Sequence, residues 1–322
     1  MHSTKASNPW IAPAEGPAAP AAGAVKAVPV RRPGRWITGA LCLLLGTALL
    51  HAVVYNPRFQ WDVVGHYMTA GRILHGLLTT LELTVIAMVI GIVLGVVLAV
   101  MRLSDNPIAR ASAWLYIGFF RGTPVLVQLI FWFNLSALFP HIALGVPGGP
   151  DLLLIDVNVL ITPFVAAILG LGLNQGAYMS EIVRSGIVSI PHGQRQAAAA
   201  LGLSRHQTMR RIILPQAMRV IIPPTGNETV GMLKMTSIVS VVALSELLYS
   251  AQSIYTMTYE TIPLLIVVSF WYVVITTILT IGQTFIERHY SRGATPGHSP
   301  TIGQRFRRNL SPLRSRISRS AT

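Results

Sequence analysis

Long apolar stretches separated by short polar segments constrain the fold of this chain more than any other feature. Of its 322 residues, 52% are hydrophobic and only 11% are charged, whereas about a quarter of the residues in a soluble globular chain carry a charge. A chain so poor in charge cannot cover a surface that faces water. Because about 20 apolar residues in a helix cross the ~30 Å hydrocarbon core of a bilayer, the sequence predicts an all-α integral membrane protein.

Six stretches are long enough to cross a membrane. They lie at residues 36–56 and at about 77–101, 112–139, 157–180, 229–250 and 262–286. The first could instead be a signal peptide, but its length, its late start and the lack of a clear small-residue cleavage site favour a transmembrane helix. Residues 57–76 place Trp61, Val64 and Tyr67 at near-helical spacing, which is typical of an amphipathic helix on the membrane surface, here the periplasmic one.

The basic residues predict the orientation of these spans. Most of the 25 lysines and arginines fall in 1–35, 102–111, 184–225 and 288–322, and six spans place all four segments on one side. Cytoplasmic segments are enriched in Lys and Arg, so we expect both termini in the cytoplasm. Residues 1–35, rich in Ala and Pro, are predicted to be a disordered tail, and 291–322 a basic tail that stays in solvent or lies on anionic lipid.

Several classes of function find no support in the sequence. The net charge of +14 would suggest nucleic acid if it formed a folded patch, but it is spread over the segments between spans. The histidines and the single cysteine, Cys42, show no metal-ligand spacing. Neither a phosphate-binding G-x4-G-K-[ST] loop nor a nucleophile–base cluster is present. We therefore predict no metal, no catalytic residue and no cofactor, and we set aside a membrane enzyme.

The loop at 191–216 is the most distinctive segment. From Gln196 it reads QAAAALGLSRHQTMRRIILPQA. The alanines at 197–200 favour a helix, Gly202 interrupts it, and a second helical stretch is expected to end at Pro215. The pattern predicts two short helices joined at a glycine, which form a compact cytoplasmic projection small enough to enter a groove of a partner.

This loop resembles the E-A-A-x3-G-x9-I-x-L-P segment of the permease subunits of bacterial ATP-binding-cassette importers. The matching positions are Ala197, Ala198, Gly202, Ile212, Leu214 and Pro215. Gln196 replaces the usual Glu, so a salt bridge to the ATPase is in doubt at that position.

Five flanking segments are similar to the polar amino acid uptake branch of that family. They are 176–186, 190–195, Arg121-Gly122-Thr123-Pro124 with Gln128, 223–227, and the KMTS sequence at 234–237. Met235 stands where the family has an acid, which weakens any role that needs a carboxylate there.

The resemblance implies a fold and a set of partners. It implies a five-span importer-type permease core at 77–290, to which 36–56 adds one N-terminal transmembrane helix. It also implies that a partner ATPase dimer binds and hydrolyses ATP and that the loop at 191–216 couples this to alternating access. An extracytoplasmic solute-binding protein would deliver the solute, and a second permease subunit, either this chain or a sister chain, would complete the pathway.

Charged residues within spans suggest a substrate pathway. A charge near the bilayer centre costs about 2.5–3.5 kcal/mol on insertion scales, so such residues pair, face the bundle interior or line a path. Our candidates for contact with a zwitterionic amino acid are Glu82, Arg121, Lys234, Thr236 and Ser237. Structural pairing is the alternative, and we prefer it for Glu181 and Glu246, near span ends.

Two other readings of the function stay open. The chain could import a different small solute, because the loop motif is common to importers of many substrates. It could also be a secondary transporter that an ion gradient drives through the same intramembrane carboxylates, although that leaves the spacing of the 191–216 loop unexplained. The solute itself, whether glutamate, glutamine, arginine or an opine-like compound, cannot be read from the sequence.

Overall fold

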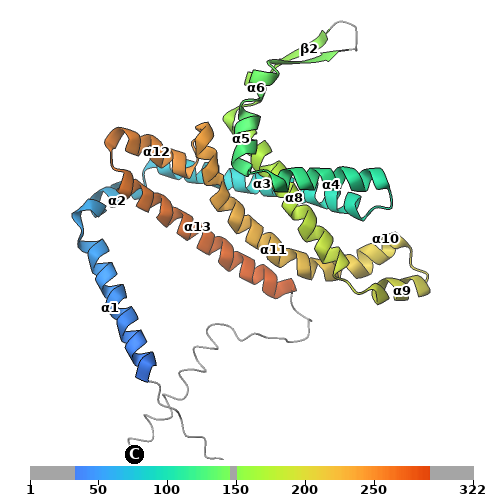
Figure 1. Cartoon of the computed structure of the whole chain (residues 1–322), viewed down its shortest axis with the longest axis horizontal. Helices are drawn as coiled ribbons and strands as arrows, with labels where there is room; N and C mark the ends of the chain where they lie inside the picture. Colours follow the sequence, from blue (N-terminus) through green and yellow to red (C-terminus); the bar gives the residue numbers. More distant parts are fainter. Residues whose placement is uncertain (1–32, 146–150, 291–322) are drawn as a thin grey trace, which may run out of the picture. The chain divides into compact units, whose positions relative to one another are not determined.

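The structure is a computed structural model that describes residues 33–145 and 151–290 (Figure 1). The chain divides into two compact units, Met1–Asn56 and Pro57–Thr322. The two tails predicted from the sequence therefore lie almost entirely outside the described residues.

In the first unit, the described residues form the helix α1 at Pro33–Tyr55. Its apolar part, Ile37–Tyr55, is 19 residues long, and nearly all of its described side chains are exposed within the unit. A helix that is apolar on every side is stable where its surroundings are apolar as well, as in lipid. Residues 36–56, predicted to be a transmembrane helix, are thus helical up to Tyr55.

The second unit begins with short elements and a very long helix. These are the turn η1 at Pro57–Phe59, the helix α2 at Trp61–Met68 and the helix α3 at Gly71–Leu103. Val64 of α2 is buried in a cluster with Ile73 of α3 and with Leu264 of the last helix, α13 (Thr261–Tyr290). The indole Nε1 of Trp271 donates a hydrogen bond of 3.0 Å to the Met68 carbonyl, which holds α2 against the bundle.

Helices α3 and α8 (Pro163–Val188) pack along each other at the centre of this unit. Glycines on both helices make the approach close. Gly91 lies against Gln175 and Gly95 against Met179, while Gly176 lies against Leu94. Small residues at four-residue spacing let membrane helices approach closely, and the structure uses both of the pairs present here, Gly91/Gly95 and Gly172/Gly176, in this way.

The stretch predicted as one span at 112–139 is divided in the structure. Helix α4, Pro107–Gly122, is followed by α5, Val125–Phe133, and the two axes differ by 99°. Pro124 lacks a backbone N–H and forces the residue before it into an extended conformation, and Thr123 accordingly has ψ 142. The break is therefore a consequence of the Thr123-Pro124 sequence.

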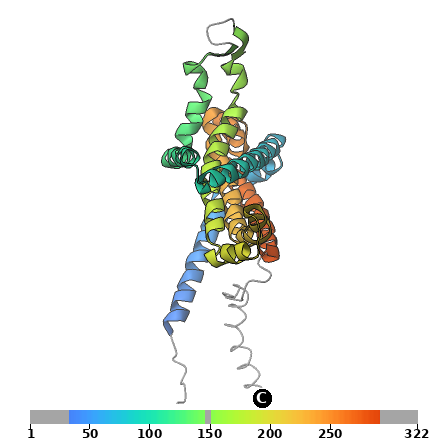
Figure 2. The same ribbon diagram turned by 90° about the vertical axis from the view of Figure 1, so that its right-hand side faces the viewer.

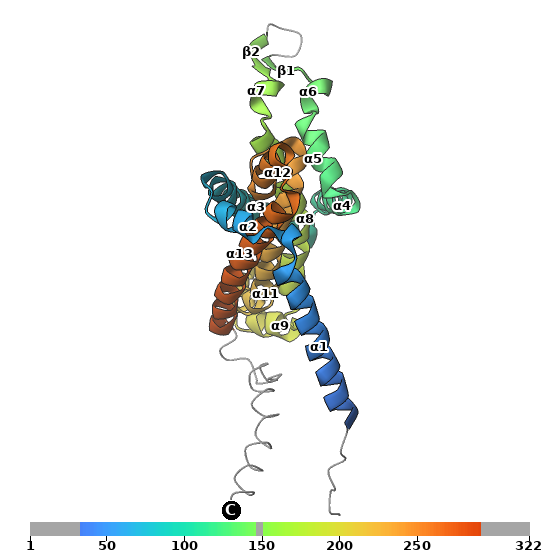
Figure 3. The ribbon, with the colours of Figure 1, turned by 90° about the vertical axis from the view of Figure 1, so that its left-hand side faces the viewer.

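A small hairpin follows α5, in a segment where the sequence suggested no strand. Its elements are α6 at Leu135–Leu138, β1 at His141–Gly145, β2 at Asp151–Asp156 and α7 at Val157–Leu160. The strands pair antiparallel, with His141 opposite Asp156. Figure 3 shows the hairpin beyond α5, at the end of the unit opposite to the helix α9 (His192–Ala200).

The rest of the unit runs from the loop at 191–216 to the last helix. Its elements are α9 at His192–Ala200, α10 at Arg205–Thr208, the π-helical turn η2 at Met209–Ile213, α11 at Leu214–Met235, the 3-10 segment η3 at Thr236–Val242, α12 at Leu247–Thr258 and α13 at Thr261–Tyr290. Helices α11 and α13 lie side by side (Figures 1 and 2). The span predicted at 229–250 is bent by 45° before α12.

Among the described residues, three helices are long and apolar enough to cross a membrane, namely α1, α3 and α13, and five spans result if each bent pair counts as one. Helix α8 is absent from this group although it lies at the centre of the bundle. Its middle carries Asn174 and Gln175, which lower its hydropathy and are buried inside the unit. The helical membrane fold agrees with the sequence, and the count of six spans stays a prediction.

Candidate functional site

The candidate coupling segment begins with α9, and its backbone geometry explains the glycine at 202. Gly202 has φ +73, a left-handed conformation that glycine adopts without steric cost. Its N–H donates to the Ala199 carbonyl at 3.0 Å and the N–H of Leu203 donates to the Ala198 carbonyl at 3.1 Å. These two bonds form a Schellman motif. Gly202 thus ends the first helix, as predicted.

The second helix of the segment starts with a capping box. The Ser204 hydroxyl accepts a hydrogen bond from the N–H of Gln207 at 3.2 Å, and the Gln207 side chain accepts one from the N–H of Ser204 at 2.9 Å. The N–H groups of Ser204 and Gln207, which have no partner within the helix, each gain one in this way. Hydrogen bonds therefore fix the turn on both sides, at Gly202 and at Ser204.

The predicted end of this helix at Pro215 is wrong. Helix α10 continues through the π-helical turn η2 directly into α11, whose first turn contains Pro215. A proline is tolerated in the first turn of an α-helix because its missing N–H has no required partner there. The π-helical turn shifts the hydrogen-bond pattern just before it. The coupling segment is therefore continuous with a helix of the bundle.

The exposed face of the segment is made by residues of the resemblance. Gln196, Ala197, Leu214 and Pro215 are exposed, Ile212 is half-buried, and Ala198 is buried. Leu201, beside the glycine, is 79% exposed and is therefore accessible to a partner.

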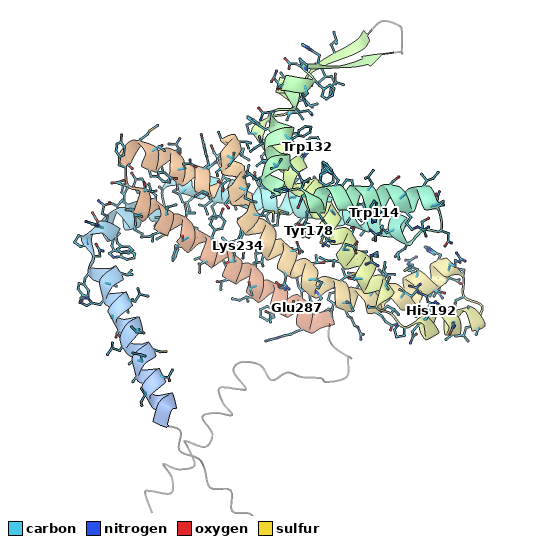
Figure 4. All side chains as sticks on the ribbon, in the orientation of Figure 1. Trp114, Trp132, Tyr178, His192, Lys234 and Glu287 are labelled. Atoms are coloured by element: carbon cyan, nitrogen blue, oxygen red, sulfur yellow. The ribbon has the colours of Figure 1, made fainter. Side chains whose placement is uncertain are left out.

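Two kinds of contact fix the segment to the bundle. The guanidinium of Arg195 donates to the Ile187 carbonyl in the last turn of α8 at 3.3 Å. Ile213 is buried with Ile187 and Ile190 in an apolar cluster. In Figure 4, His192 marks the start of α9, at the opposite end of this unit from the hairpin.

An ion-pair network lies on the same side of the unit as the coupling segment. Glu181 of α8 pairs with Arg102 of α3 at 3.4 Å and with Arg184 at 2.9 Å. The interpretation of Glu181 as a structurally paired residue is therefore confirmed. Asp105, after α3, lies 3.5 Å from Arg205 of α10 in a fully exposed pair, where such a pair contributes little stability.

Of the five substrate-pathway candidates, Glu82 occupies the clearest cleft. It lines a cavity of about 320 Å³ together with His75, Thr79, Ser245 and Phe164. A carboxylate with hydroxyl groups near it can accept hydrogen bonds from an ammonium or a guanidinium group.

The other four candidates lie elsewhere. Arg121 lies in the last turn of α4 and over the ring of Tyr178, 5.2 Å from its centroid. Lys234 is exposed on α11 (Figure 4). The hydroxyls of Thr236 and Ser237 donate to the backbone carbonyls of Leu233 and Lys234 at the end of α11, each at 2.7 Å. Within the described part of the chain, no single cavity contains all five residues, so a common pathway role stays a prediction.

Sequence reasoning missed a buried amide cluster at the α4–α5 break. The Gln128 amide donates to the Phe120 carbonyl at 3.0 Å and to the Thr123 hydroxyl at 2.7 Å. Asn174 of α8 donates to the same Phe120 carbonyl at 2.8 Å. The cluster supplies donors to the Phe120 carbonyl, which the break leaves without a helical partner. It also connects the α4–α5 break to α8. A signal existed, because amide residues inside apolar runs need such partners.

Glu246 is a second buried polar residue with a structural role, as the sequence suggested. Its carboxylate accepts hydrogen bonds from the N–H groups of Leu248 and Tyr249 at 2.9 and 2.7 Å, and from the Tyr272 hydroxyl at 3.3 Å. It therefore caps the N-terminus of α12.

With this geometry established, comparison with known proteins identifies the family. Residues 91–292 match the family described as binding-protein-dependent transport system inner membrane component. The chain is 45% identical over 273 residues, 84% of each sequence, to the arginine transport system permease protein ArgU of Corynebacterium glutamicum. The chain belongs to the permease subunits of amino acid ABC importers. It is also 32% identical over 232 residues to the glutamine transport system permease protein GlnP of Escherichia coli, covering 97% of that protein and 72% of this one.

Solved structures agree with this assignment. The permease matches a chain of the crystal structure of an amino acid ABC transporter with histidines, with a TM-score of 0.58, 33% identity and coverage of 68% of this chain and 94% of that one. A chain of the inward-facing MetNI methionine ABC transporter shares the fold, with a TM-score of 0.55 at 16% identity, over 69% of this chain and 98% of that one. This permease is therefore a multi-pass protein of the inner membrane and not itself an enzyme, since the ATPase activity of such importers belongs to a partner chain.

Proposed function

We propose that this permease couples ATP hydrolysis by a partner ATPase dimer to the import of a polar amino acid, and that the segment at 191–216 is the coupling element. The observation that carries the proposal is the rigid turn at Gly202, which presents Gln196, Ala197 and Leu201 outward at the end of the bundle. Exposed apolar and small side chains on a fixed turn suit a groove in another protein.

The continuity of α10, η2 and α11 suggests how a movement would be transmitted. A partner that pushes the turn displaces α11 as well, since no flexible loop separates them. Helix α11 contains Pro223 and Pro224 in its interior, and interior prolines weaken the helical hydrogen-bond ladder. We infer that α11 pivots there when the permease alternates between outward-facing and inward-facing states.

The partners follow from the same mechanism. Each subunit of a two-fold ATPase dimer needs one coupling segment. A second permease subunit, identical to this chain or related to it by two-fold pseudosymmetry, provides the second segment. ATP is bound by the ATPase chains. An extracytoplasmic solute-binding protein delivers the substrate on the side of the hairpin, while the coupling segment and both termini lie in the cytoplasm, as the basic residues predict.

For the substrate, arginine is our first candidate among polar amino acids. The permease is 45% identical to a protein named as an arginine transport permease. In addition, Glu82 lines the small cleft between α3, the start of α8 and the segment after η3, where a carboxylate can bind a guanidinium or an ammonium group. Import of another small solute is the alternative, and a substrate panel distinguishes the two.

The coupling role is tested by Gly202→Asp. The left-handed backbone at Gly202 disfavours a side chain, and the aspartate also places a charge on the exposed turn. We expect the variant complex to lose substrate-stimulated ATP hydrolysis and uptake in proteoliposomes. Gly65→Asp is the matched control, because Gly65 lies on an exposed helical face where a Cβ meets nothing within 4 Å. If Gly202→Asp assembles and transports like wild type, the assignment is wrong.

The substrate-pathway residues are tested by Glu82→Gln, Arg121→Gln and Lys234→Gln. Each change removes a charge and keeps a side chain that can form hydrogen bonds. We expect the concentration of arginine that gives half-maximal uptake to rise about tenfold or more for at least one variant that still assembles and hydrolyses ATP, since loss of a charged partner costs about 1.5–3 kcal/mol. Unchanged values for all three would reject the pathway role.

A further inference from the structure

A large groove lies on the coupling side of the bundle, separate from the Glu82 cleft. It has a volume of about 1070 Å³ and walls from α3, α8, α11 and α13. Nothing in the coupling mechanism requires it, and its size exceeds that of a void between well-packed helices.

The walls of the groove are aliphatic and open to the surroundings. Ile92, Val96 and Val100 line it from α3 at four-residue spacing and are 37%, 43% and 59% exposed. Ile278 and Ile286 line it from α13 and are 58% and 52% exposed. Water in such a groove would leave this apolar surface hydrated, which is unfavourable.

The hydroxyl and amide donors in the walls of the groove already form hydrogen bonds within the protein. The hydroxyls of Thr225 and Thr229 donate to the carbonyls of Ile221 and Thr225, at 2.8 and 2.9 Å. The Gln283 amide donates to the Pro223 carbonyl at 3.2 Å and to Glu287 at 2.7 Å. Because these donors are satisfied within the protein, an aliphatic occupant leaves none of them unpaired.

The length of the groove matches one leaflet of a bilayer. Its lining on α3 extends from Ile92 to Leu103, and at about 1.5 Å per residue this corresponds to about 17 Å. Half of a hydrocarbon core of about 30 Å is about 15 Å. An acyl chain that enters from the membrane surface would therefore be covered along its length.

The segment beside the mouth of the groove is basic. Arg205 and Asp105 line the mouth as an ion pair of 3.5 Å, and both side chains are almost completely exposed. Such a pair contributes little stability, so a phosphate can replace Asp105 as the partner of Arg205. The segment from Arg205 to Arg219 also contains Arg210 and Arg211 and has no acidic residue. Arginine binds phosphate through paired N–H donors, and the positive charge of this segment attracts an anionic headgroup to the mouth.

We propose that this groove binds an anionic phospholipid of the cytoplasmic leaflet, with acyl chain along Ile92, Val96 and Val100 and phosphate at Arg205. The proposal rests on the orientation given under the proposed function. A lipid held here would contact α11, the helix that continues from the coupling segment, on both sides of its internal prolines.

The groove is tested by filling it. Gly282 lines the groove, and a Cβ added there meets nothing within 4 Å, so the backbone accepts a side chain at this position and Gly282→Phe adds a ring beside the groove. The assembled transporter is purified from nanodiscs of equal phosphatidylglycerol and phosphatidylcholine, and retained lipid is measured by native mass spectrometry. We expect wild type to retain phosphatidylglycerol and Gly282→Phe to retain it about tenfold less, which corresponds to about 1.4 kcal/mol.

Gly118→Phe is the matched control, because Gly118 on α4 is equally open and lies outside the groove. It should retain lipid like wild type. Equal retention by Gly282→Phe and wild type would overturn the proposal. The readout needs neither nucleotide nor solute, so it is independent of whether the transporter imports an amino acid.

The headgroup contact is tested separately by Arg205→Gln. We expect this variant to lose the preference for phosphatidylglycerol over phosphatidylcholine, whereas Arg219→Gln, on the same basic segment but outside the groove lining, keeps it. A preference unchanged by Arg205→Gln would contradict the assignment of the mouth.

A photo-crosslinking residue at Val100 identifies the occupant even if Gly282→Phe fails to assemble. A covalent adduct with phospholipid supports the proposal. An adduct with a second permease copy, or with the N-terminal helix of the chain, would show that protein fills the groove and would overturn it.

Discussion

Single glycines set how closely the two central helices approach. A Cβ added to Gly95 would lie 2.5 Å from the Cβ of Met179 and 2.9 Å from the Ser180 nitrogen. The second of these atoms belongs to the backbone and cannot move aside as a side chain can. The position therefore excludes every residue larger than glycine unless α3 and α8 separate.

Gly95→Leu should consequently destabilise the permease by about 1–3 kcal/mol, as overpacked cores do. Thermal unfolding in detergent, followed by the loss of the monodisperse peak in size-exclusion chromatography, measures this as a lower midpoint. Gly118→Leu is the control, since its Cβ meets nothing within 4 Å. A midpoint for Gly95→Leu equal to that of the control would show that the helices pack less tightly than described.

Much of the coupling segment could be predicted at this scale. The break at Gly202 follows from helix propensity, because a glycine after four alanines is a frequent helix terminator. Amides inside apolar runs indicate that Gln128 and Asn174 need partners, but the partners themselves could not be predicted, because only the three-dimensional fold brings them near.

Among the elements, the division of α4 and α5 is the clearest departure from the hydropathy pattern. The apolar stretch is continuous in sequence, but the helix axis turns by 99° at Thr123-Pro124. Hydropathy reports the medium around a segment and not its direction. The proline marks the place of the break, and the side chains of Gln128 and Asn174 form hydrogen bonds to the Phe120 carbonyl there.

The buried amide at this bend should matter for its stability. Gln128→Leu removes the donor to Phe120 and Thr123 in a buried site, and an unsatisfied buried group costs about 1–3 kcal/mol. The same thermal assay should show a clearly lower midpoint for this variant.

Asn134→Leu is the matched control for that change. The Asn134 amide also donates to a backbone carbonyl, that of Ile130 at 2.8 Å, but it does so in an exposed position, where solvent can replace it. If both variants unfold at the wild-type midpoint, the amide cluster does not hold the bend.

The end of the helix after Gly202 was also predicted wrongly. A proline at 215 indicates a helix end when the residues before it are helical, and a single sequence does not reveal the π-helical turn that accommodates it. This difference has a functional consequence, because it joins the coupling segment to α11 without a loop.

At the scale of the whole molecule, the helical membrane class follows from composition, and the family follows from the spacing of the loop motif. The number of spans does not follow from hydropathy, because α8 buries its amides against other helices and so needs less apolar surface than a helix in lipid. The sequence places Glu82, Arg121 and Lys234 in three different spans, but it does not reveal that they line no common cavity among the described residues, since this depends on which helix faces are turned inward.

The central claim is that a fixed cytoplasmic turn transmits the work of a separate ATPase to helices that bind no nucleotide. It is tested most directly by uptake of radiolabelled arginine and a panel of other amino acids into proteoliposomes that contain the permease, its ATPase and its solute-binding protein. We predict uptake that requires internal ATP, the ATPase chain and an intact Gly202, and that is insensitive to dissipation of ion gradients. Uptake by the permease alone, driven by an ion gradient with no ATPase present, would contradict the account.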